Sequence, residues 1–285
     1  MPLNIKDLNY FYMTGTPFEV HALNNVSLEV SDGEFVGIIG HTGCGKSTLI
    51  QLIAGLLKPS SGTIAINGED INASGYDRKK LRRTVGVVFQ YPEYQLFEET
   101  VGRDVAFGPL KVGMSEAETE KNVNTALELV GFTPEKIKEI SPFDLSGGQK
   151  RKVAIAGVLA MDPSILILDE PIAGLDPIGR EQFMELIQKL NESGVTILMI
   201  SHNMDGLCDY ASRVIAMDHG GVYADGTPKE VFSDLEKLRA VGLGASEARE
   251  AADMLQKRGW DIPSDIIKKD ELVSYILKRK EDGKC

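Results

Sequence analysis

A glycine-rich run at residues 40–48, GHTGCGKST, has the residue types and spacing of a phosphate-binding loop. Its glycines let successive backbone N–H groups turn inward around phosphate oxygens. Lys46 can reach the β- and γ-phosphates of a nucleotide, and Ser47 can hold Mg²⁺ through its hydroxyl. The alternative is a glycine-rich turn without a ligand. The candidate nucleotide-binding residues here are Gly40, His41, Thr42, Gly43, Cys44, Gly45, Lys46, Ser47 and Thr48.

Two adjacent carboxylates, Asp169 and Glu170, follow the apolar run ILIL. A buried strand that ends in Asp at the carboxyl edge of a sheet suits a second Mg²⁺ contact, made directly or through water. Glu170 could polarise the water that attacks a phosphate. Many buried strands end in an acidic residue at a turn, so the functional interpretation depends on the phosphate-binding loop being present as well.

A second glycine-bearing turn, LSGGQ, opens a helical pattern. It could be an ordinary helix start with Ser146 as the N-cap, or an anion site at the positive end of the helix. The second interpretation gives one chain two anion sites for one nucleotide. This mismatch disappears if the turn serves the nucleotide of a facing subunit. The residues of the turn are Leu145, Ser146, Gly147, Gly148 and Gln149.

Strands and helices alternate along the chain around these motifs. Short apolar runs that are typical of buried strands cover 34–39, 85–90, 165–169 and 195–201. Helical patterns cover 46–57, 115–130, 147–161 and 177–191. Further strands are expected at 22–30 and around 63–67. This order predicts an α/β fold with a mainly parallel sheet core and an antiparallel β part.

The pattern changes twice along the chain, which predicts its domains. Residues 92–162 are mostly helical and resemble an insert between two halves of the sheet. From about residue 233, apolar residues at helical spacing indicate two further helices, at 247–257 and near 272–277. We therefore expect a nucleotide-binding domain at 1–232, with a helical subdomain at about 92–162, and a small C-terminal helical extension at 233–285.

Composition excludes several classes of protein. The 285 residues are 42% hydrophobic, but no apolar run approaches the roughly 18 residues of a membrane span. The first residues do not resemble a secretory signal, so a chain that is soluble by itself is expected. The net charge of −11 and the scattered basic residues argue against a nucleic-acid partner. Cys44, Cys208 and Cys285 share no metal-ligand spacing and suit a reducing cytosol.

Together, the motifs resemble those of the ATP-binding subunits of ABC transporters, over residues 1 to about 232. The loop at 40–48 is similar to the Walker A loop, Gln90 to the Q-loop glutamine, LSGGQ to the signature and ILILDE to the Walker B strand with its glutamate. AGLD at 173–176 is similar to the D-loop, and His202 to the switch histidine. Tyr12 lies where the family has an aromatic residue that stacks on adenine. The alternatives for that role are Tyr10, Phe11 and Phe18.

The resemblance implies a catalytic set at the chain's own nucleotide. Glu170 would be the general base, and His202 would contact the γ-phosphate and orient the water. Ser47, Asp169 and Gln90 would complete the shell of Mg²⁺ and water. The implied catalytic residues are Glu170, His202, Lys46 and Gln90.

The resemblance also implies a second face, which acts on a partner. Ser146 and Gly148 would bind the γ-phosphate held by an opposing subunit, and Asp176 of the D-loop would link the two sites across the interface. The family mechanism is closure of two subunits on two ATP molecules, followed by hydrolysis and reopening.

Some segments resemble one branch of the family, the ATPases of energy-coupling factor (ECF) transporters. QYPEYQLFEETV at 90–101, DVAFGP at 104–109 and the tail with KRGWDIP carry this resemblance, whereas GTPFE at 15–19 and the GHTG start of the loop resemble the second, A′-type ATPase. In that branch the tail helps to hold the ATPase pair together. Ile172 stands where the family usually has Thr, which removes no catalytic group.

The segment after Gln90 is expected to meet a membrane subunit. Its acidic residues Glu93, Glu98 and Glu99 could receive basic residues of a coupling helix, or could belong to a solvated loop. The resemblance implies an ATPase that uses ATP and Mg²⁺ at the cytoplasmic face of the cell membrane, as a peripheral protein, to energise uptake of vitamins or other micronutrients, including cobalt or nickel ions.

The implied partners are a second ABC ATPase subunit, an integral membrane coupling subunit and substrate-binding membrane subunits. The ATPase pair could be a heterodimer or a homodimer. One alternative is the ATPase of a conventional importer that uses a binding protein. Another is a soluble ABC ATPase of translation or DNA repair, which the single ATPase domain disfavours. A phosphate-loop kinase or GTPase is disfavoured because LSGGQ has no role in those folds.

Overall fold

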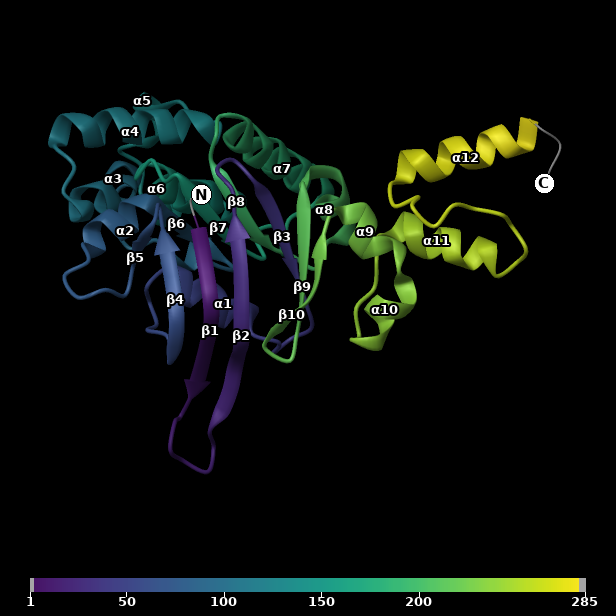
Figure 1. The fold of residues 1–285 in the computed structure, drawn as a ribbon. Helices are drawn as coiled ribbons and strands as arrows, with labels where there is room; N and C mark the ends of the chain where they lie inside the picture. Colours follow the sequence, from purple (N-terminus) through teal and green to yellow (C-terminus); the bar gives the residue numbers. More distant parts are fainter. Residues whose placement is uncertain (1–2, 282–285) are drawn as a thin grey trace.

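The computed structural model describes residues 3–281, and Cys285 lies outside them. Within these residues the strands form two sheets, of which one is antiparallel with the order β2-β1-β4-β5 (Figure 1). Its strands are β1 (Leu3–Tyr12), β2 (Val20–Val30), β4 (Ser61–Ile66) and β5 (Glu69–Asp70). Strand β1 was not predicted from the sequence. Register shifts along its pairing with β2 interrupt the alternation of apolar and polar residues that marks a strand.

The second sheet carries the nucleotide motifs and has the order β10-β9-β3-β8-β7-β6. Its strands are β3 (Phe35–Ile39), β6 (Val85–Val88), β7 (Ile165–Asp169), β8 (Thr196–Ile200), β9 (Arg213–Asp218) and β10 (Gly221–Gly226). All its described pairings are parallel except that of β9 with β10, which confirms the predicted α/β fold with a mainly parallel core.

Successive residues of the central strands pack into different cores. On β7, Leu166 and Leu168 belong to one hydrophobic cluster, whereas Ile165 and Ile167 belong to the other. This follows from the alternating direction of side chains along a strand. Since both faces are covered, the parallel strands consist of continuous apolar runs.

Helices cover both faces of the central sheet. The core helices are α1 (Lys46–Ile53), α7 (Pro177–Glu192) and α8 (Met204–Tyr210). Helix α1 ends at Ile53, earlier than the predicted end at residue 57. The cause is Gly55, whose φ of 67° is left-handed and ends a helix readily.

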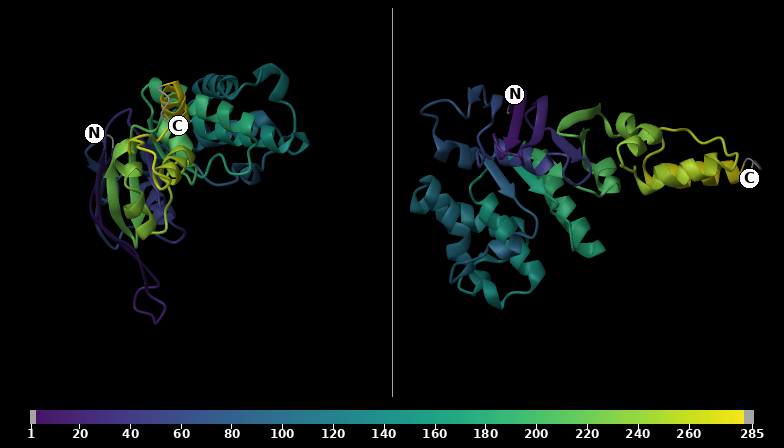
Figure 2. Two further views of the ribbon diagram at one scale, coloured as in Figure 1. Left: turned by 90° about the vertical axis from the view of Figure 1, so that its right-hand side faces the viewer. Right: turned by 90° about the horizontal axis from the view of Figure 1, so that it is seen from below.

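The region between Gln90 and β7 is mainly helical and lies to one side of the sheets (Figure 2). It follows α2 (Arg78–Thr84) and contains η1 (Pro92–Gln95), α3 (Val101–Val112), α4 (Glu116–Leu129), α5 (Pro134–Ile137), η2 (Pro142–Asp144) and α6 (Gly147–Leu159). Helix α3 was not predicted from the sequence. Its Gly102, Gly108 and Pro109 lower the local helix propensity.

The C-terminal part extends away from the end of the sheet at β9 and β10 (Figure 1). It consists of α9 (Pro228–Ser233), α10 (Leu235–Ala240), α11 (Glu247–Gln256) and α12 (Lys269–Glu281). Phe232 and Leu238 belong to the same hydrophobic cluster as Leu166 and Leu168 of β7, whereas α11 and α12 share a small separate cluster. Its buried members are Ala248, Ala252, Ile262, Ile266 and Leu272. The boundary at residue 233 remains a prediction.

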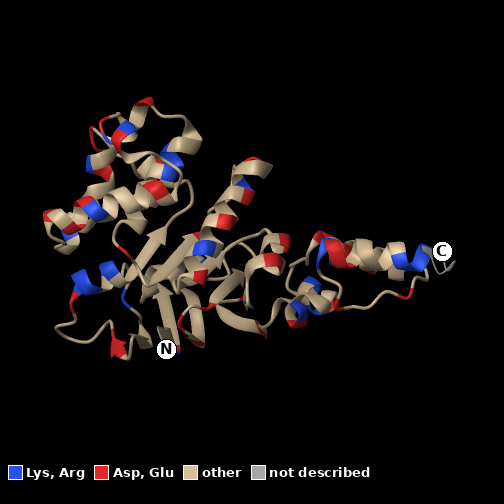
Figure 3. Cartoon of the chain, turned by 90° about the horizontal axis from the view of Figure 1, so that it is seen from above, with Lys and Arg blue, Asp and Glu red and all other residues tan. Residues whose placement is uncertain are grey.

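Most charged residues lie on helices and loops, and the strands of the central sheet carry few of them (Figure 3). Helices α2 and α6 carry basic residues without acidic ones, whereas the short strand β5 consists of Glu69 and Asp70. Helix α12 has acidic residues in its first turn and basic residues in its last turn, which complements the helix dipole. None of the helices within residues 3–281 has both the length and the apolar character that a bilayer crossing requires.

Candidate active site

The phosphate loop, residues 40–48, connects the end of β3 to the start of α1. A Cβ at Gly40 would lie 2.4 Å from Sγ of Cys44 and 2.6 Å from the carbonyl oxygen of Met217. A Cβ at Gly45 would lie 2.6 Å from the carbonyl oxygen of Ala22, and Gly45 has a φ of 107°. Glycine is therefore required here both by packing and by backbone conformation. The loop is fixed against β2 and β9 on either side.

Lys46 is buried within its own loop. Its Nζ donates hydrogen bonds to the carbonyl oxygens of Gly40, at 2.6 Å, and His41, at 2.9 Å. The side chain of His41 is also held, because its Nε2 lies 2.9 Å from Oδ1 of Asp218, at the end of β9. The hydrogen bonds of Lys46 keep its positive charge at the N-terminus of α1, where a phosphate would meet the N–H groups of the helix.

A cleft of about 640 Å³ brings most of the predicted catalytic residues together. The phosphate loop, the end of β7, the residues after β6 and β8, and the β1–β2 hairpin surround it. The carboxyl ends of these parallel strands meet at one edge of the sheet, which is the usual position of a ligand site in such folds. Its predicted members are Tyr12, Thr42, Gly43, Gly45, Lys46, Ser47, Thr48, Gln90, Asp169, Glu170 and His202.

The two carboxylates in the cleft are half-buried. Burial raises the pKa of Asp169, and the charge of Lys46 opposes this shift. Burial likewise raises the pKa of Glu170, opposed by the adjacent His202. A carboxylate with a raised pKa holds a proton more readily, as a general base requires.

Glu170 also has an unusual geometry. Its φ is 50°, in the left-handed region, and its N–H donates to the carbonyl oxygen of Ile200 at 3.0 Å. Oε2 accepts a long hydrogen bond from the backbone N–H of His202 at 3.4 Å. Oε1 is buried without a hydrogen-bond partner among residues 3–281, although Nε2 of His202 lies 3.4 Å away. The residue itself lines the cleft, where a general base would meet the attacking water.

The aromatic candidates for adenine stacking lie in different environments. Tyr12 lines the cleft, and its hydroxyl lies 3.2 Å from Oγ1 of Thr48. Phe11 is stacked on His21, with ring centroids 4.0 Å apart, and Phe18 is exposed near the tip of the hairpin. Tyr10 packs edge-on against Tyr12, with ring centroids 4.8 Å apart, and is not a lining residue of the cleft. Of the four candidates, Tyr12 is the one that lines the nucleotide cleft, and its stacking role remains a prediction.

Sequence reasoning missed two histidines that line the cleft, His21 and His219. His21 lies on β2, and His219 lies in the tight turn between β9 and β10. The sequence contained no signal for either, because only long-range folding brings β2 and the β9–β10 turn to the phosphate loop.

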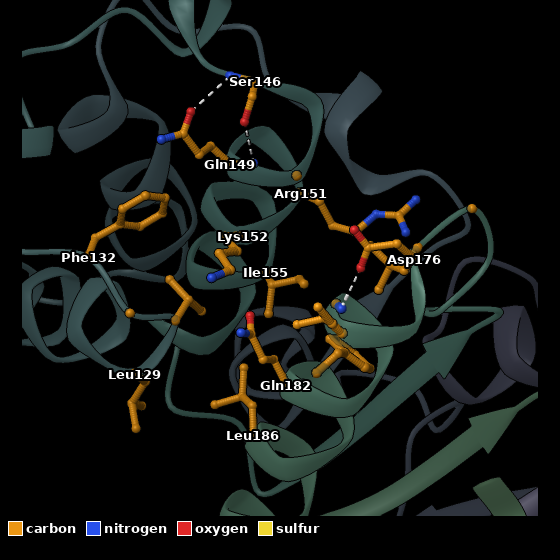
Figure 4. Close-up of a pocket in the computed structure, with 18 residues that line it drawn as sticks. Leu129, Phe132, Ser146, Gln149, Arg151, Lys152, Ile155, Asp176, Gln182 and Leu186 are labelled. Carbon is orange, nitrogen blue, oxygen red and sulfur yellow. Dashed lines mark hydrogen bonds between the residues drawn. The ribbon is translucent and has the colours of Figure 1, made fainter.

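The signature turn, residues 145–149, lies away from this cleft. It lines a second hollow, of about 830 Å³, and the two hollows share no lining residue within the described part of the chain (Figure 4). Ser146 is the N-cap of α6, which was one of the two expected alternatives. Its Oγ accepts from the N–H of Gln149, and Oε1 of Gln149 accepts from the N–H of Ser146. A Cβ at Gly147 or Gly148 would meet no described atom within 4 Å. The N-terminus of α6 is therefore open.

Asp176 lies in the same hollow as the signature turn. Its Oδ1 accepts a hydrogen bond from the N–H of Gly179 at 2.6 Å, so it is the N-cap of α7. The structure thus groups the predicted residues into two sets, one around Lys46 and the other around Ser146. The two sets do not meet within this chain.

Arg151 is a further residue that sequence reasoning missed. It lies on α6, is buried, and forms a two-pronged ion pair with Glu93. Glu93 thus has a basic partner within this chain, which neither expected alternative, a coupling helix or a solvated loop, included; its contact with a membrane subunit stays a prediction. Glu98 and Glu99 remain candidates for such a contact.

Comparison with known proteins identifies the family of the chain. The sequence model of the ABC transporter family matches residues 23–173. A relative from Symbiobacterium thermophilum, called energy-coupling factor transporter ATP-binding protein EcfA2, is 50% identical over 276 residues, which cover 97% of this chain and 96% of the relative.

Two solved structures share the fold. The structure of cbiO1 from Clostridium perfringens, described as part of the ABC transporter complex cbiONQ, matches with a TM-score of 0.73 and 41% identity, covering 89% of this chain and 98% of cbiO1. The ATP-binding cassette MJ0796, in a dimeric post-hydrolysis state bound to ADP and Pi, matches with a TM-score of 0.70 and 32% identity over 79% of this chain and 98% of that one.

Proposed function

Because the chain belongs to the ABC transporter family and, within it, to the ATP-binding subunits of energy-coupling factor transporters, we propose that it hydrolyses MgATP to energise uptake through a membrane subunit. One observation carries this proposal. The phosphate loop, Asp169, Glu170 and His202 surround a single cleft, while the signature turn is left open on another face.

The cleft supplies binding and proton transfer. The N–H groups of the loop and of α1 bind the phosphates, and Lys46 neutralises their charge. Glu170 accepts a proton from the attacking water while the oxygen of that water bonds to the γ-phosphorus. The bond from this phosphorus to the β–γ bridging oxygen then breaks. His202, next to Glu170, orients this water and contacts the γ-phosphate. Ser47, Asp169 and Gln90 would hold Mg²⁺, which neutralises phosphate charge when bound.

The open signature turn supports a role for two chains. The N–H groups at the start of α6 and the hydroxyl of Ser146 would bind the γ-phosphate of an opposing ATPase subunit. Asp176 would meet that subunit at the same interface. The opposing subunit would be a related chain or a second copy of this one, with α11 and α12 as the element that holds the pair together.

An exposed aromatic surface next to Gln90 supports attachment to a membrane subunit. It runs from Tyr91 through η1 and the residues after it to α3, and two ring pairs, Tyr91 with Tyr94 and Phe97 with Phe107, lie on it. Its exposed members are Tyr91, Tyr94, Phe97, Phe107 and Leu110. Exposed apolar side chains gathered in one place mark a site of interaction. We place this surface against the integral coupling subunit, so that the chain is a peripheral protein at the cytoplasmic face of the membrane. Substrate-binding membrane subunits would select the vitamin or other micronutrient.

Glu98 and Glu99 lie within this surface, which gives a test of the contact. Reversal of both charges, Glu98→Lys with Glu99→Lys, should weaken assembly with the membrane subunit while nucleotide binding is unchanged, because basic residues of the partner would be repelled. Assembly is measured by co-purification, and nucleotide binding by fluorescence titration. Normal assembly of the double variant would contradict this placement.

Purification from native membranes tests the function as a whole. The tagged chain is extracted gently, and the co-purifying proteins are identified by mass spectrometry. We expect a second ATPase, a shared membrane subunit and small membrane proteins that identify the substrates. Two permeases with an external binding protein would instead indicate a conventional importer. Recovery with ribosomes or DNA in the soluble fraction would exclude transport.

A further inference from the structure

Arg151 connects three segments that the reaction uses. Its Nε and Nη2 donate to the two carboxylate oxygens of Glu93, at 2.9 and 3.0 Å, and its Nη1 donates to the carbonyl oxygen of Ala173 at 2.8 Å. The side chain is only 6% exposed, so solvent does not compete for these contacts. The planar guanidinium fixes both partners at once, which a single ammonium group cannot do.

Each contact of Arg151 leads to a functional residue. Glu93 lies on η1, just after Gln90 and at the edge of the exposed aromatic surface. Ala173 closes the turn after β7, because its N–H donates to the carbonyl oxygen of Glu170 at 3.2 Å. Arg151 itself lies in the second turn of α6, the helix that begins at the signature turn. Figure 4 shows it on the side of α6 that faces the loop with Asp176.

We propose that Arg151 is a positioning residue that couples the segment after Gln90 to the turn that holds Glu170. The proposal rests on the proposed function and deepens it. A displacement of η1 by a membrane subunit moves Glu93, and the two-pronged contact transmits this to α6 and to the carbonyl group of Ala173. The turn at Glu170 then shifts relative to the phosphate loop. Hydrolysis therefore responds to the membrane subunit through a mechanical link inside this chain.

Stability alone is a weak reason for such a contact. A buried ion pair loses its hydration on folding, and apolar residues of similar size often serve equally well. Its geometric effect is different, because the guanidinium holds three segments at fixed distances. A displacement of about 1 Å of a catalytic group can lower a rate about 100-fold. Loss of the link should therefore affect catalysis more than folding.

The chain contains a matched control. Arg213 on β9 makes a two-pronged pair with Asp225, at 2.5 and 2.6 Å, and its Nη1 donates to the carbonyl oxygen of Glu29 at 2.8 Å. It has the same three kinds of contact as Arg151 and, in addition, an ion pair with Glu34 at 3.3 Å. None of its partners lies in the nucleotide cleft or the signature turn.

The test compares four variants in the complete transporter complex. Arg151→Lys keeps the charge but cannot span both partners, Glu93→Gln removes the charge with little change of shape, and Arg151→Met with Glu93→Gln removes the pair without leaving a buried charge. Arg213→Lys is the control. For each, kcat and KM of ATP hydrolysis, ATP affinity and the thermal unfolding midpoint are measured.

We expect kcat to fall about 10- to 100-fold in all three Arg151 and Glu93 variants, with KM and ATP affinity within about twofold of wild type. The double variant should be no slower than the slower single variant, because both changes break one link. Arg213→Lys should lower the unfolding midpoint but leave kcat unchanged.

Several results would overturn the proposal. A merely structural role predicts that kcat recovers in the double variant together with stability. Equal losses of kcat in the Arg213 control, or wild-type kcat in Arg151→Lys, would also contradict it. An inactive wild-type complex would refute the proposed function itself. If Arg151→Lys does not fold, Glu93→Gln and the double variant decide.

Discussion

The phosphate loop and the signature turn have the same local structure but differ in how tightly the rest of the chain packs around them. Each is a glycine-bearing turn that opens a helix, α1 or α6. At Gly40 and Gly45 an added Cβ would collide with β9 or β2, whereas at Gly147 and Gly148 it would meet nothing within 4 Å among the described atoms. The first turn is completed by its own chain. The second is shaped internally only by its capping box.

This difference shows where each site obtains its ligand geometry. In the phosphate loop, the surrounding core fixes the N–H groups, and the half-buried carboxylates of Asp169 and Glu170 lie in the same cleft. At the signature turn, the chain provides a positive helix end. Among the described lining residues of its hollow, Asp176 is the one carboxylate, and it caps α7. Two such chains, each giving its open turn to the other's completed loop, would form two whole sites.

Of the variants that test this difference, Glu170→Gln is expected to have the largest effect on ATP turnover, because it changes the nucleotide cleft and leaves the signature turn intact. Loss of the general base should lower ATP turnover of the assembled complex about 100- to 10,000-fold, with ATP still bound. Steady-state hydrolysis and nucleotide binding measure this, with Glu185→Gln, an exposed acid of α7, as the control. Unchanged turnover would mean that Glu170 is not the base or that this site does not turn over.

Gly148→Asp tests the open turn in the same way. A carboxylate at the start of α6 would repel the γ-phosphate of the facing subunit, so turnover should fall about 10- to 100-fold. ATP affinity of the isolated chain should not change, because the substitution lies outside its own cleft. A parallel loss of affinity in the isolated chain would contradict the separation of the two sites.

The packing difference itself predicts unequal effects of one methyl group. Gly40→Ala should destabilise the chain by about 1–3 kcal/mol through overpacking against Cys44 and Met217. Gly147→Ala adds the same methyl group where nothing opposes it and should be close to neutral. Denaturant unfolding of the two variants gives the comparison. Equal destabilisation would show that the signature turn is as tightly packed as the loop.

The smallest expected effect concerns pH. Burial raises the pKa of Asp169 above its ordinary 3.8, so between 3.8 and the raised pKa the folded state binds more protons than the unfolded state. Folding stability from this group therefore falls as pH rises through that window. Asp169→Asn removes the penalty and should stabilise the nucleotide-free chain at pH 7 by at most about 1 kcal/mol, since solvent screens a half-buried group. A gain that does not shrink toward pH 4 would argue against this cause.

Most of the site could be predicted because its residues occur in contiguous motifs. ILILD became β7 with the predicted bounds, and the phosphate loop lies between a strand and a helix as expected. The pairing of Arg151 with Glu93 could not be predicted, because 58 positions separate the two residues and no sequence motif contains both. His21 and His219 were missed for the same reason. Strand β1 was missed because bulges interrupt its alternation.

The small separate core of α11 and α12 has a consequence for the kinetics of the proposed cycle. If this extension holds two ATPase chains together, each open signature turn faces its partner's phosphate loop at an effective concentration of about millimolar order. Closure on ATP would then be a first-order event, independent of how dilute the protein is. The subunits could separate at their nucleotide faces after every hydrolysis without ever dissociating.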